Sequence, residues 1–428
     1  MNAKMKLLGL TGMMSLMLVS CSKDEMVASN PGDEIVFNTR VTRATETTTQ
    51  TLTKIRVYAD AAGYDEMFIK GDVAEKKGDN GYFQFAKNYY WPNDVKTIRF
   101  WSYGPADIFT EEEMKAHVEI TAGTQRFNDC TPKSGVDNPG KEHKDLVVAY
   151  TSANRHNDPN VSGSNVNLDF HHAFTQVVVK AKNGSAAAGD DTKTVKIKGA
   201  WIVNVKPTGN LVFTESAASN NYMSWTASGE KTYYGLSYTN DQVVTLSPDL
   251  QPLIDVDKLN SSLMLVPQSL DKWNLETDKP NGNNGAYILL LCRIEIKHAG
   301  AQHPDSDTSD DPVHSEGEYH YHQLFPVIPD GGEYNANAYG YTCVPIDTQW
   351  QPGKKYVYNL EFCGTQSGAG IYPPTPAAPF PLGDDVITEI PDGKNIGDTV
   401  LDDPISFTVT LEEWTDAGVT ETPEVPVP

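Results

Sequence analysis

The chain has 428 residues, of which 39% are hydrophobic and 21% are charged, a composition typical of a globular protein with two or three domains. Its 57 acidic and 34 basic residues give a formal net charge of −23. A chain this acidic repels nucleic acid phosphates and anionic lipid head groups, so we expect no nucleic acid partner and no membrane binding through a basic surface.

The N-terminus has the features of an export signal. Lys4 and Lys6 precede an apolar run that is shorter than the ~20 residues needed to cross a bilayer. The run ends in Leu18-Val19-Ser20-Cys21, which resembles the lipobox of bacterial lipoproteins and implies acylation of Cys21. Residues 22–25, Ser-Lys-Asp-Glu, resemble the signal that exports lipoproteins of Bacteroidetes to the outer face of the outer membrane. The alternative is an ordinary signal peptide with a chance cysteine.

A β-prone run rich in branched and aromatic side chains occupies residues 34–43. It contains Arg40 and ends at Arg43, and a polar, threonine-rich link begins at Ala44. A strand tied to a lipid anchor and followed by an arginine at the start of a flexible link is a strand that a protease could remove.

Short alternating strands separated by turn residues fill the rest of the chain, with almost no helical periodicity. The clearest are residues 53–59, 97–103, 145–150, 166–170, 195–203, 287–296, 356–362 and 405–411. The small and flexible residues 183–191 are the best linker in the first half. The pattern predicts an all-β fold of sandwiches, with one domain at residues 44–184 and a larger one at residues 185–428.

Motifs for chemistry are few. There is no nucleophile elbow, phosphate-binding loop or zinc-protease motif, so we expect no enzyme and no cofactor. His320-Tyr321-His322 places two imidazoles on one strand face. We expect an exposed polar hairpin there, with metal binding as the less favoured alternative, because no ligand set with a known spacing appears.

Four cysteines follow Cys21, and none forms a C-x-x-C pair: Cys130, Cys292, Cys343 and Cys363. Export would permit disulfides in any of three full pairings, and buried thiols are the alternative.

The order and spacing of these segments resemble the fimbrillin family, the Mfa-like type V pilins of Bacteroidetes, over nearly the whole chain. The residues that carry the resemblance are the lipobox, residues 35–44, 55–59, 90–93, 98–103, 145–149, 168–174, 350–356 and 407–414. The resemblance implies two tandem transthyretin-like, Greek-key β-sandwich domains behind a precursor segment. That segment would be a signal peptide at residues 1–20 and a lipidated propeptide with the first strand at residues 21–43.

The resemblance also implies a maturation and assembly pathway. An arginine-specific protease would cut between Arg43 and Ala44, and Arg40 offers a competing cut. A C-terminal strand of another pilin subunit, from residues 405–428, would then fill the vacated groove. Its inward row would be Ile405, Phe407, Val409 and Leu411.

The implied location is the outer membrane, through the lipid on Cys21, before maturation and the fimbrium afterwards, where the protein would meet a host or bacterial surface ligand. The proline-rich tail beyond Trp414 departs from the family pattern and suggests a specialised subunit.

Two alternatives stay open. Residues 405–411 could equally complete their own C-terminal sheet, because sequential strands tend to pair locally. The protein could also be a surface lipoprotein that binds glycans without polymerising, through exposed aromatic clusters at Tyr89-Tyr90-Trp91 or Tyr233-Tyr234. Buried aromatic clusters would favour the pilus subunit.

Overall fold

The computed structural model describes residues 34–41, 51–78, 82–132, 145–154, 161–162, 165–185, 192–213, 223–254, 263–275, 285–299, 313–316, 319–328, 335–374, 380, 385–401, 403–413 and 424–425. The regular secondary structure of these residues is nearly all β-strand, apart from a 3-10 turn (Asn240–Gln242) and one short α-helix, α1 (Glu111–His117), which Thr110 and Glu113 cap reciprocally. The predicted all-β fold class is confirmed. Among the described segments, no helix combines the length and the apolar character that crossing a bilayer would require.

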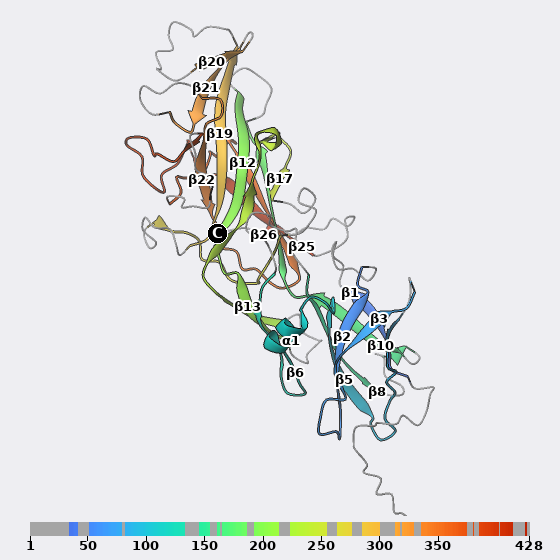
Figure 1. Cartoon of the computed structure of the whole chain (residues 1–428). Helices are drawn as coiled ribbons and strands as arrows, with labels where there is room; N and C mark the ends of the chain where they lie inside the picture. The colour runs from blue at the N-terminus through green and yellow to red at the C-terminus, as the bar shows by residue number, and fades with distance from the viewer. Residues whose placement is uncertain are drawn as a thin grey trace, which may run out of the picture.

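The N-terminal sheet has eight strands in the order β1-β4-β3-β2-β5-β8-β10-β9. Their bounds are β1 (Val36–Val41), β2 (Lys54–Ala61), β3 (Ile69–Lys76), β4 (Phe83–Phe85), β5 (Thr97–Gly104), β8 (Val147–Asn154), β9 (Val161–Ser162) and β10 (Asn165–His172). An additional pairing joins β1 to β10, so seven of these strands close into a ring with β1 as the closing strand. In Figure 1 this sheet forms the lower end of an elongated molecule.

The position of β5 between two cores explains why its sequence carries large apolar residues on both faces. Ile98 and Phe100 face the core enclosed by the N-terminal sheet. Trp101 and Tyr103 face a second core on the outer side of the same sheet. A strand buried on both faces has no polar row, and this sheet is therefore covered on both sides at β5.

A four-stranded junction sheet provides that cover, in the order β14-β13-β7-β6. Its strands are β6 (Val118–Ile120), β7 (Gln125–Cys130), β13 (Thr208–Phe213) and β14 (Met223–Ser228). It joins β7 to β13, which lies far along the chain, and it lies at the waist of the molecule in Figure 1. Stacked Phe127 and Phe213, with ring centroids 5.6 Å apart, pack the two halves of this sheet together.

Two further sheets enclose the largest core. One contains β17-β11-β23-β25-β26 with β18 paired to β11; the other contains β15-β12-β19-β21-β20 with β16, β22 and β24 attached. Their bounds are β11 (Thr175–Asn183), β12 (Thr192–Val205), β15 (Thr232–Ser237), β16 (Val244–Thr245), β17 (Gln251–Ile254), β18 (Met264–Leu265), β19 (Tyr287–Ala299), β20 (Val313–Glu316), β21 (Tyr319–Phe325), β22 (Tyr339–Pro345), β23 (Lys354–Phe362), β24 (Val386–Ile387), β25 (Ser406–Glu413) and β26 (Glu424–Val425).

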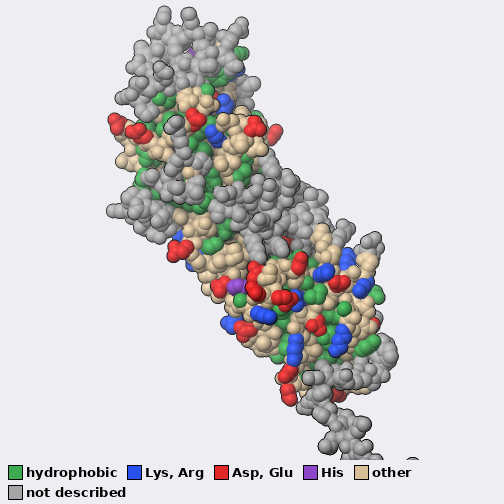
Figure 2. All heavy atoms as spheres, viewed as in Figure 1, with side chains coloured by type: hydrophobic (Ala, Val, Ile, Leu, Met, Phe, Trp, Pro, Cys, Tyr) green, Lys and Arg blue, Asp and Glu red, His purple; other side chains and the backbone are tan. Residues whose placement is uncertain are grey.

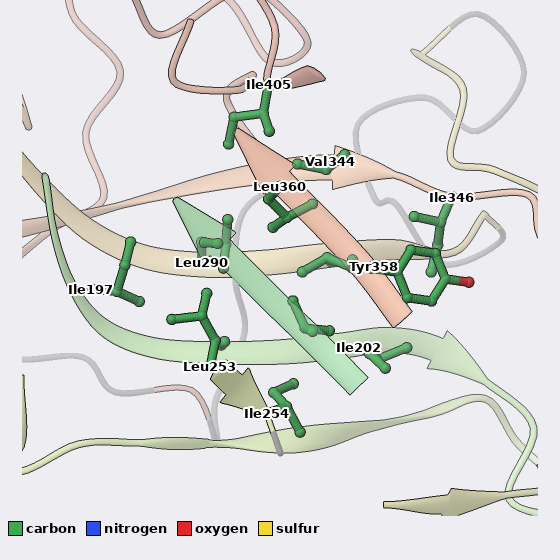
Figure 3. Close-up of a cluster of buried hydrophobic side chains, with 14 of the residues drawn as sticks. Ile197, Ile202, Leu253, Ile254, Leu290, Val344, Ile346, Tyr358, Leu360 and Ile405 are labelled. Atoms are coloured by element: carbon green, nitrogen blue, oxygen red, sulfur yellow. The ribbon is translucent and has the colours of Figure 1, made fainter. Parts of the chain in front are cut away.

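These two C-terminal sheets pack face to face. Figure 3 shows Ile202 and Leu290 of one sheet directed toward Tyr358 and Leu360 of the other. All four side chains are buried, which is the inward row expected of a β-sandwich.

Sheet membership changes at Ala173 and Phe174, between β10 and β11. Every partner of β11 lies later in the chain, in β17, β18 and β23. The predicted boundary at Gly184 falls just after β11, a strand that already belongs to the C-terminal sheets. The division into residues 44–184 and 185–428 stays a prediction.

Candidate assembly site

The strand β1 lies in the seam of the N-terminal sheet, which is the position between β10 and β4 where the ring of strands closes. It runs parallel to β10 through six consecutive residue pairs, from Val36 opposite Asn165 to Val41 opposite Phe170. On its other side it is antiparallel to β4, and the backbone N–H of Ile35 donates to the carbonyl of Tyr89 at 2.7 Å. Among the strands that the structure describes, β1 therefore closes the ring by joining β10 to β4.

The inner face of β1 is apolar. Ile35 and Phe37 are fully buried in the core that the ring encloses. The Phe37 ring lies 5.6 Å from that of Phe85 and 5.5 Å from that of Phe100, both nearly perpendicular. Burying each of these side chains contributes about 1.5–3 kcal/mol, so loss of β1 would leave a costly apolar groove.

The outer face of β1 carries the buried Val36 and, next along the strand, the half-buried Asn38. The Asn165 amide donates to Oδ1 of Asn38 at 2.9 Å, and the Asn38 amide donates to Oδ1 of Asn167 at 3.2 Å. Near the start of the strand, the Gln84 amide donates to Glu34 at 2.5 Å. This face is thus held by side-chain hydrogen bonds in addition to the backbone ladder.

Much of β10 depends on β1 for its pairing. Away from β1, the strand pairs with β9 only at Asn165 and Val166, and with β8 only at His171 and His172. Within the described residues, the middle of β10 (residues 167–170) has β1 as its ladder partner. Removing β1 would expose an unpaired strand edge, which is a template for another strand.

The structure describes only some of the predicted modification and cleavage residues. Cys21, Arg43 and Ala44 lie outside the described residues. Arg40 lies inside β1, where its backbone pairs with Asp169. β1 ends at Val41, two residues before Arg43.

The predicted donor row lies in the C-terminal half. β25 is antiparallel to β23, with Val409 opposite Tyr358, and β26 pairs with its other edge. Ile405 and Val409 are buried, whereas Phe407 and Leu411 are partly buried against the same core. The structure thus brings the four side chains together on one face, within the chain's own sheet.

The aromatic clusters that would serve as glycan platforms are packed into the protein. Trp91 and Tyr234 are buried. Tyr89 makes edge-on contacts with neighbouring phenylalanines, and Tyr233 lies 4.7 Å from the ring of Phe380. Neither cluster offers the flat, exposed pair that stacking on a sugar requires.

The expected exposed hairpin at His320 and His322 is wrong for these two side chains. They are 1% and 4% exposed, and their rings lie 5.1 Å apart. They belong to β21, which lies between β19 and β20 in the sheet. Among the described residues, no three His, Cys, Asp or Glu side chains are grouped to hold a metal ion.

The four later cysteines are buried thiols in this structure and form no disulfide among themselves. Burial raises the pKa of Cys130 to about 12 and also raises the pKa of Cys292 and Cys343. Thiols with such pKa values are almost entirely protonated at neutral pH and are poor nucleophiles.

A buried pair that sequence reasoning missed joins the ends of two strands. Nδ1 of His172 lies 2.7 Å from Oδ2 of Asp145, and both side chains are inaccessible to solvent. Close by, the hydroxyl of Thr175 donates to the carbonyl of Gln351 at 2.6 Å. These contacts hold the passage from β10 to β11 in place.

The Asn38, Asn165 and Asn167 contacts were also missed. Their sequence signal was available, because asparagine is depleted in strands and two of them alternate on β10. The sequence does not show that β1 pairs with β10, and only that pairing places Asn38 between Asn165 and Asn167.

Among curated proteins none matches this chain. Among solved structures, a fimbrial protein from Bacteroides vulgatus is 15% identical, covers 89% of this chain and 99% of its own, and has a TM-score of 0.50. A proposed cell adhesion protein from Parabacteroides distasonis is 9% identical, with coverages of 89% and 99% and a TM-score of 0.42. Another, from Bacteroides uniformis, is 10% identical, with coverages of 90% and 100% and a TM-score of 0.37.

The likeness to the Bacteroides vulgatus protein shows a shared fold. The family model described as fimbrillin-like matches residues 42–288, which is more than half of the 428 residues. This chain therefore belongs to the fimbrillin-like family.

Proposed function

We propose that this chain is a structural subunit of a cell-surface fimbria that matures by losing β1. It is exported as a lipoprotein on Cys21 and reaches the outer face of the outer membrane. An arginine-specific protease cuts between Arg43 and Ala44. A C-terminal strand of another subunit then takes the place of β1.

The observation that carries this proposal is the position of β1 in the seam of the N-terminal sheet. It is the first of the described strands, it precedes the predicted cut, and it closes the ring by pairing with β10 on one side and β4 on the other. Its loss would expose the edges of β10 and β4 together with the aromatic groove around Phe100. Such an edge and groove favour capture of a replacement strand.

The choice of Arg43 over Arg40 follows from the ladder. A protease needs its substrate backbone released from other hydrogen bonds, and bonds within a paired strand resist local opening. Arg40 is paired with Asp169, whereas Arg43 lies two residues beyond Val41, the last residue of β1.

The donor row suits the groove by its pattern. Aligning Ile405 with Ile35 and Phe407 with Phe37 sets Val409 where β1 has Thr39. That position faces Leu168 of β10, which is fully buried. Valine buries more apolar surface there than threonine, so the exchange gains hydrophobic free energy.

The test uses the precursor without its lipid, residues 22–428, treated with an arginine-specific protease. We expect a product that begins at Ala44, identified by N-terminal sequencing, and its slow conversion to oligomers in size-exclusion chromatography. The uncut protein, held under the same conditions, should stay monomeric. A chain cut at Arg43 that stays monomeric at high concentration would contradict the proposal.

A net charge of −23 and a visible face on which Lys and Arg alternate with Asp and Glu (Figure 2) also suit a protein that works outside the cell among other proteins. We therefore propose other fimbrial subunits, of this or a related sequence, as its principal partners, with a host or bacterial surface ligand as the target of the assembled fimbria.

A further inference from the structure

We infer that Asn165 and Asn167 of β10 form an amide clamp that selects the register of the strand in the groove. The clamp accepts a strand that places a hydrogen-bonding side chain between the two asparagines. This inference rests on the proposed replacement of β1 and adds what the incoming strand must carry.

The clamp is defined by its present occupant. Asn38 accepts a hydrogen bond from Asn165 and donates one to Asn167, so both amides bind the same side chain. All three side chains are half-buried, so water can satisfy them only in part. A hydrocarbon side chain in place of Asn38 would remove both bonds.

Register follows from the alternation of the strand. Ile35 and Phe37 point into the core while Asn38 points to the clamp. A slip by one residue would turn an apolar side chain toward the clamp and a polar one toward the core. The groove and the clamp therefore penalise the same error from opposite faces.

The occupant that we assign after maturation is β25 of a second copy. When Ile405 and Phe407 take the places of Ile35 and Phe37, Thr408 takes the place of Asn38. A threonine hydroxyl both donates and accepts, as the clamp requires. A threonine of β25 already accepts from an asparagine of a neighbouring strand, because the Asn359 amide of β23 donates to Oγ1 of Thr410 at 3.0 Å.

The experiment measures how tightly labelled peptides bind freshly cleaved chain beginning at Ala44. The probes are residues 403–413 as found in this sequence, and the same peptide with Thr408→Asn, Thr408→Val or Thr410→Val. We expect Thr408→Val to bind about threefold to tenfold more weakly than the parent, and Thr408→Asn at least as tightly. Thr410→Val is the matched control, because in this register Thr410 takes the place of Arg40, on the same face but opposite Asp169 and beyond the clamp, and the change should have little effect.

A second acceptor carries Asn165→Ala and Asn167→Ala, with its fold checked by thermal melting. On this acceptor the parent, Thr408→Asn and Thr408→Val peptides should bind alike. Equal binding of these three peptides to the unaltered acceptor would overturn the clamp and leave strand replacement standing. If none of the peptides binds the unaltered acceptor, replacement of β1 by β25 fails, and the clamp as assigned to Thr408 fails with it.

Discussion

The strands β1 and β25 carry nearly the same inward pattern in two different settings. Ile35 and Phe37 are fully buried in a ring that β1 closes. Phe407 is partly buried, in a sheet that would still hold β23, β11 and β17 without β25. One strand is the seam of its sheet, and the other lies near an edge.

The difference suggests a division of roles. Loss of a seam strand opens a groove with two unpaired edges, whereas loss of a strand near the edge exposes one new edge. The N-terminal sheet is therefore suited to accept a strand, and the C-terminal sheet to give one. The following predictions test that division, beginning with the largest effect.

Changing Arg43→Ala should abolish both the release of β1 and oligomer formation, because the proposed cut that follows β1 is lost. Arg40→Ala should leave both processes at the parent level, since residue 40 lies in the paired strand. N-terminal sequencing and size-exclusion chromatography after protease treatment measure the two results. Assembly of the Arg43→Ala protein at the parent rate would place the functional cut elsewhere.

Changing Val409→Asp should prevent assembly of cleaved protein, because a charge would enter the apolar groove. Ser406→Asp is the matched control, since Ser406 is exposed on the opposite face of β25. Val409 is 7% exposed in its own sheet, so this variant will also lose intrinsic stability. A folded Val409→Asp protein, as judged by thermal melting, that assembles like Ser406→Asp would exclude β25 as the donor.

The comparison can be sharpened by truncating the equivalent phenylalanines. Phe37→Ala should lower the unfolding free energy of the uncut protein by about 3–5 kcal/mol, because the side chain is fully buried among Phe85 and Phe100. Phe407→Ala should cost about 1–2 kcal/mol, since its ring is partly exposed beside Tyr358. Denaturant unfolding measures both, and equal losses would argue against the contrast between the two strands.

How far the sequence predicts this site depends on what periodicity can report. The β-prone composition of residues 34–43 and the alternation in residues 405–411 predict two strands, and β1 and β25 confirm both strands. Periodicity reports the face of a strand but not its partner. The parallel pairing of Val36 with Asn165 spans more than 120 residues of sequence, so no local pattern contains it.

The same limit explains the remaining differences. β11 reads as a continuation of the N-terminal strands, yet its parallel partner β23 lies much later in the chain. His320 and His322 are polar by residue type, and only their place between β19 and β20 buries them. Local propensity predicts these strands correctly, but the sheet that β11 joins and the burial of the two histidines depend on tertiary pairing.

The smallest expected effect reports whether β25 leaves its own sheet on assembly. Cys363 follows β23, and its backbone N–H donates to the carbonyl of Gly368. Gly368 in turn donates to the carbonyl of Pro404, directly before β25. Because this segment is tied to the start of β25, departure of the strand should expose the Cys363 thiol. We expect alkylation of Cys363 to become several-fold faster in oligomers than in uncut monomer.

Cys130 provides the internal control for that measurement. Burial raises the pKa of its thiol to about 12, and it lies in the core beneath the junction sheet, far from β25 in sequence. Its alkylation should stay slow in monomer and oligomer alike, and mass spectrometry of labelled peptides distinguishes the sites. If Cys363 stays as protected as Cys130 in oligomers that have lost β1, β25 has remained in its own sheet. The donor must then come from the residues after Trp414, where β26 already pairs with the edge of β25.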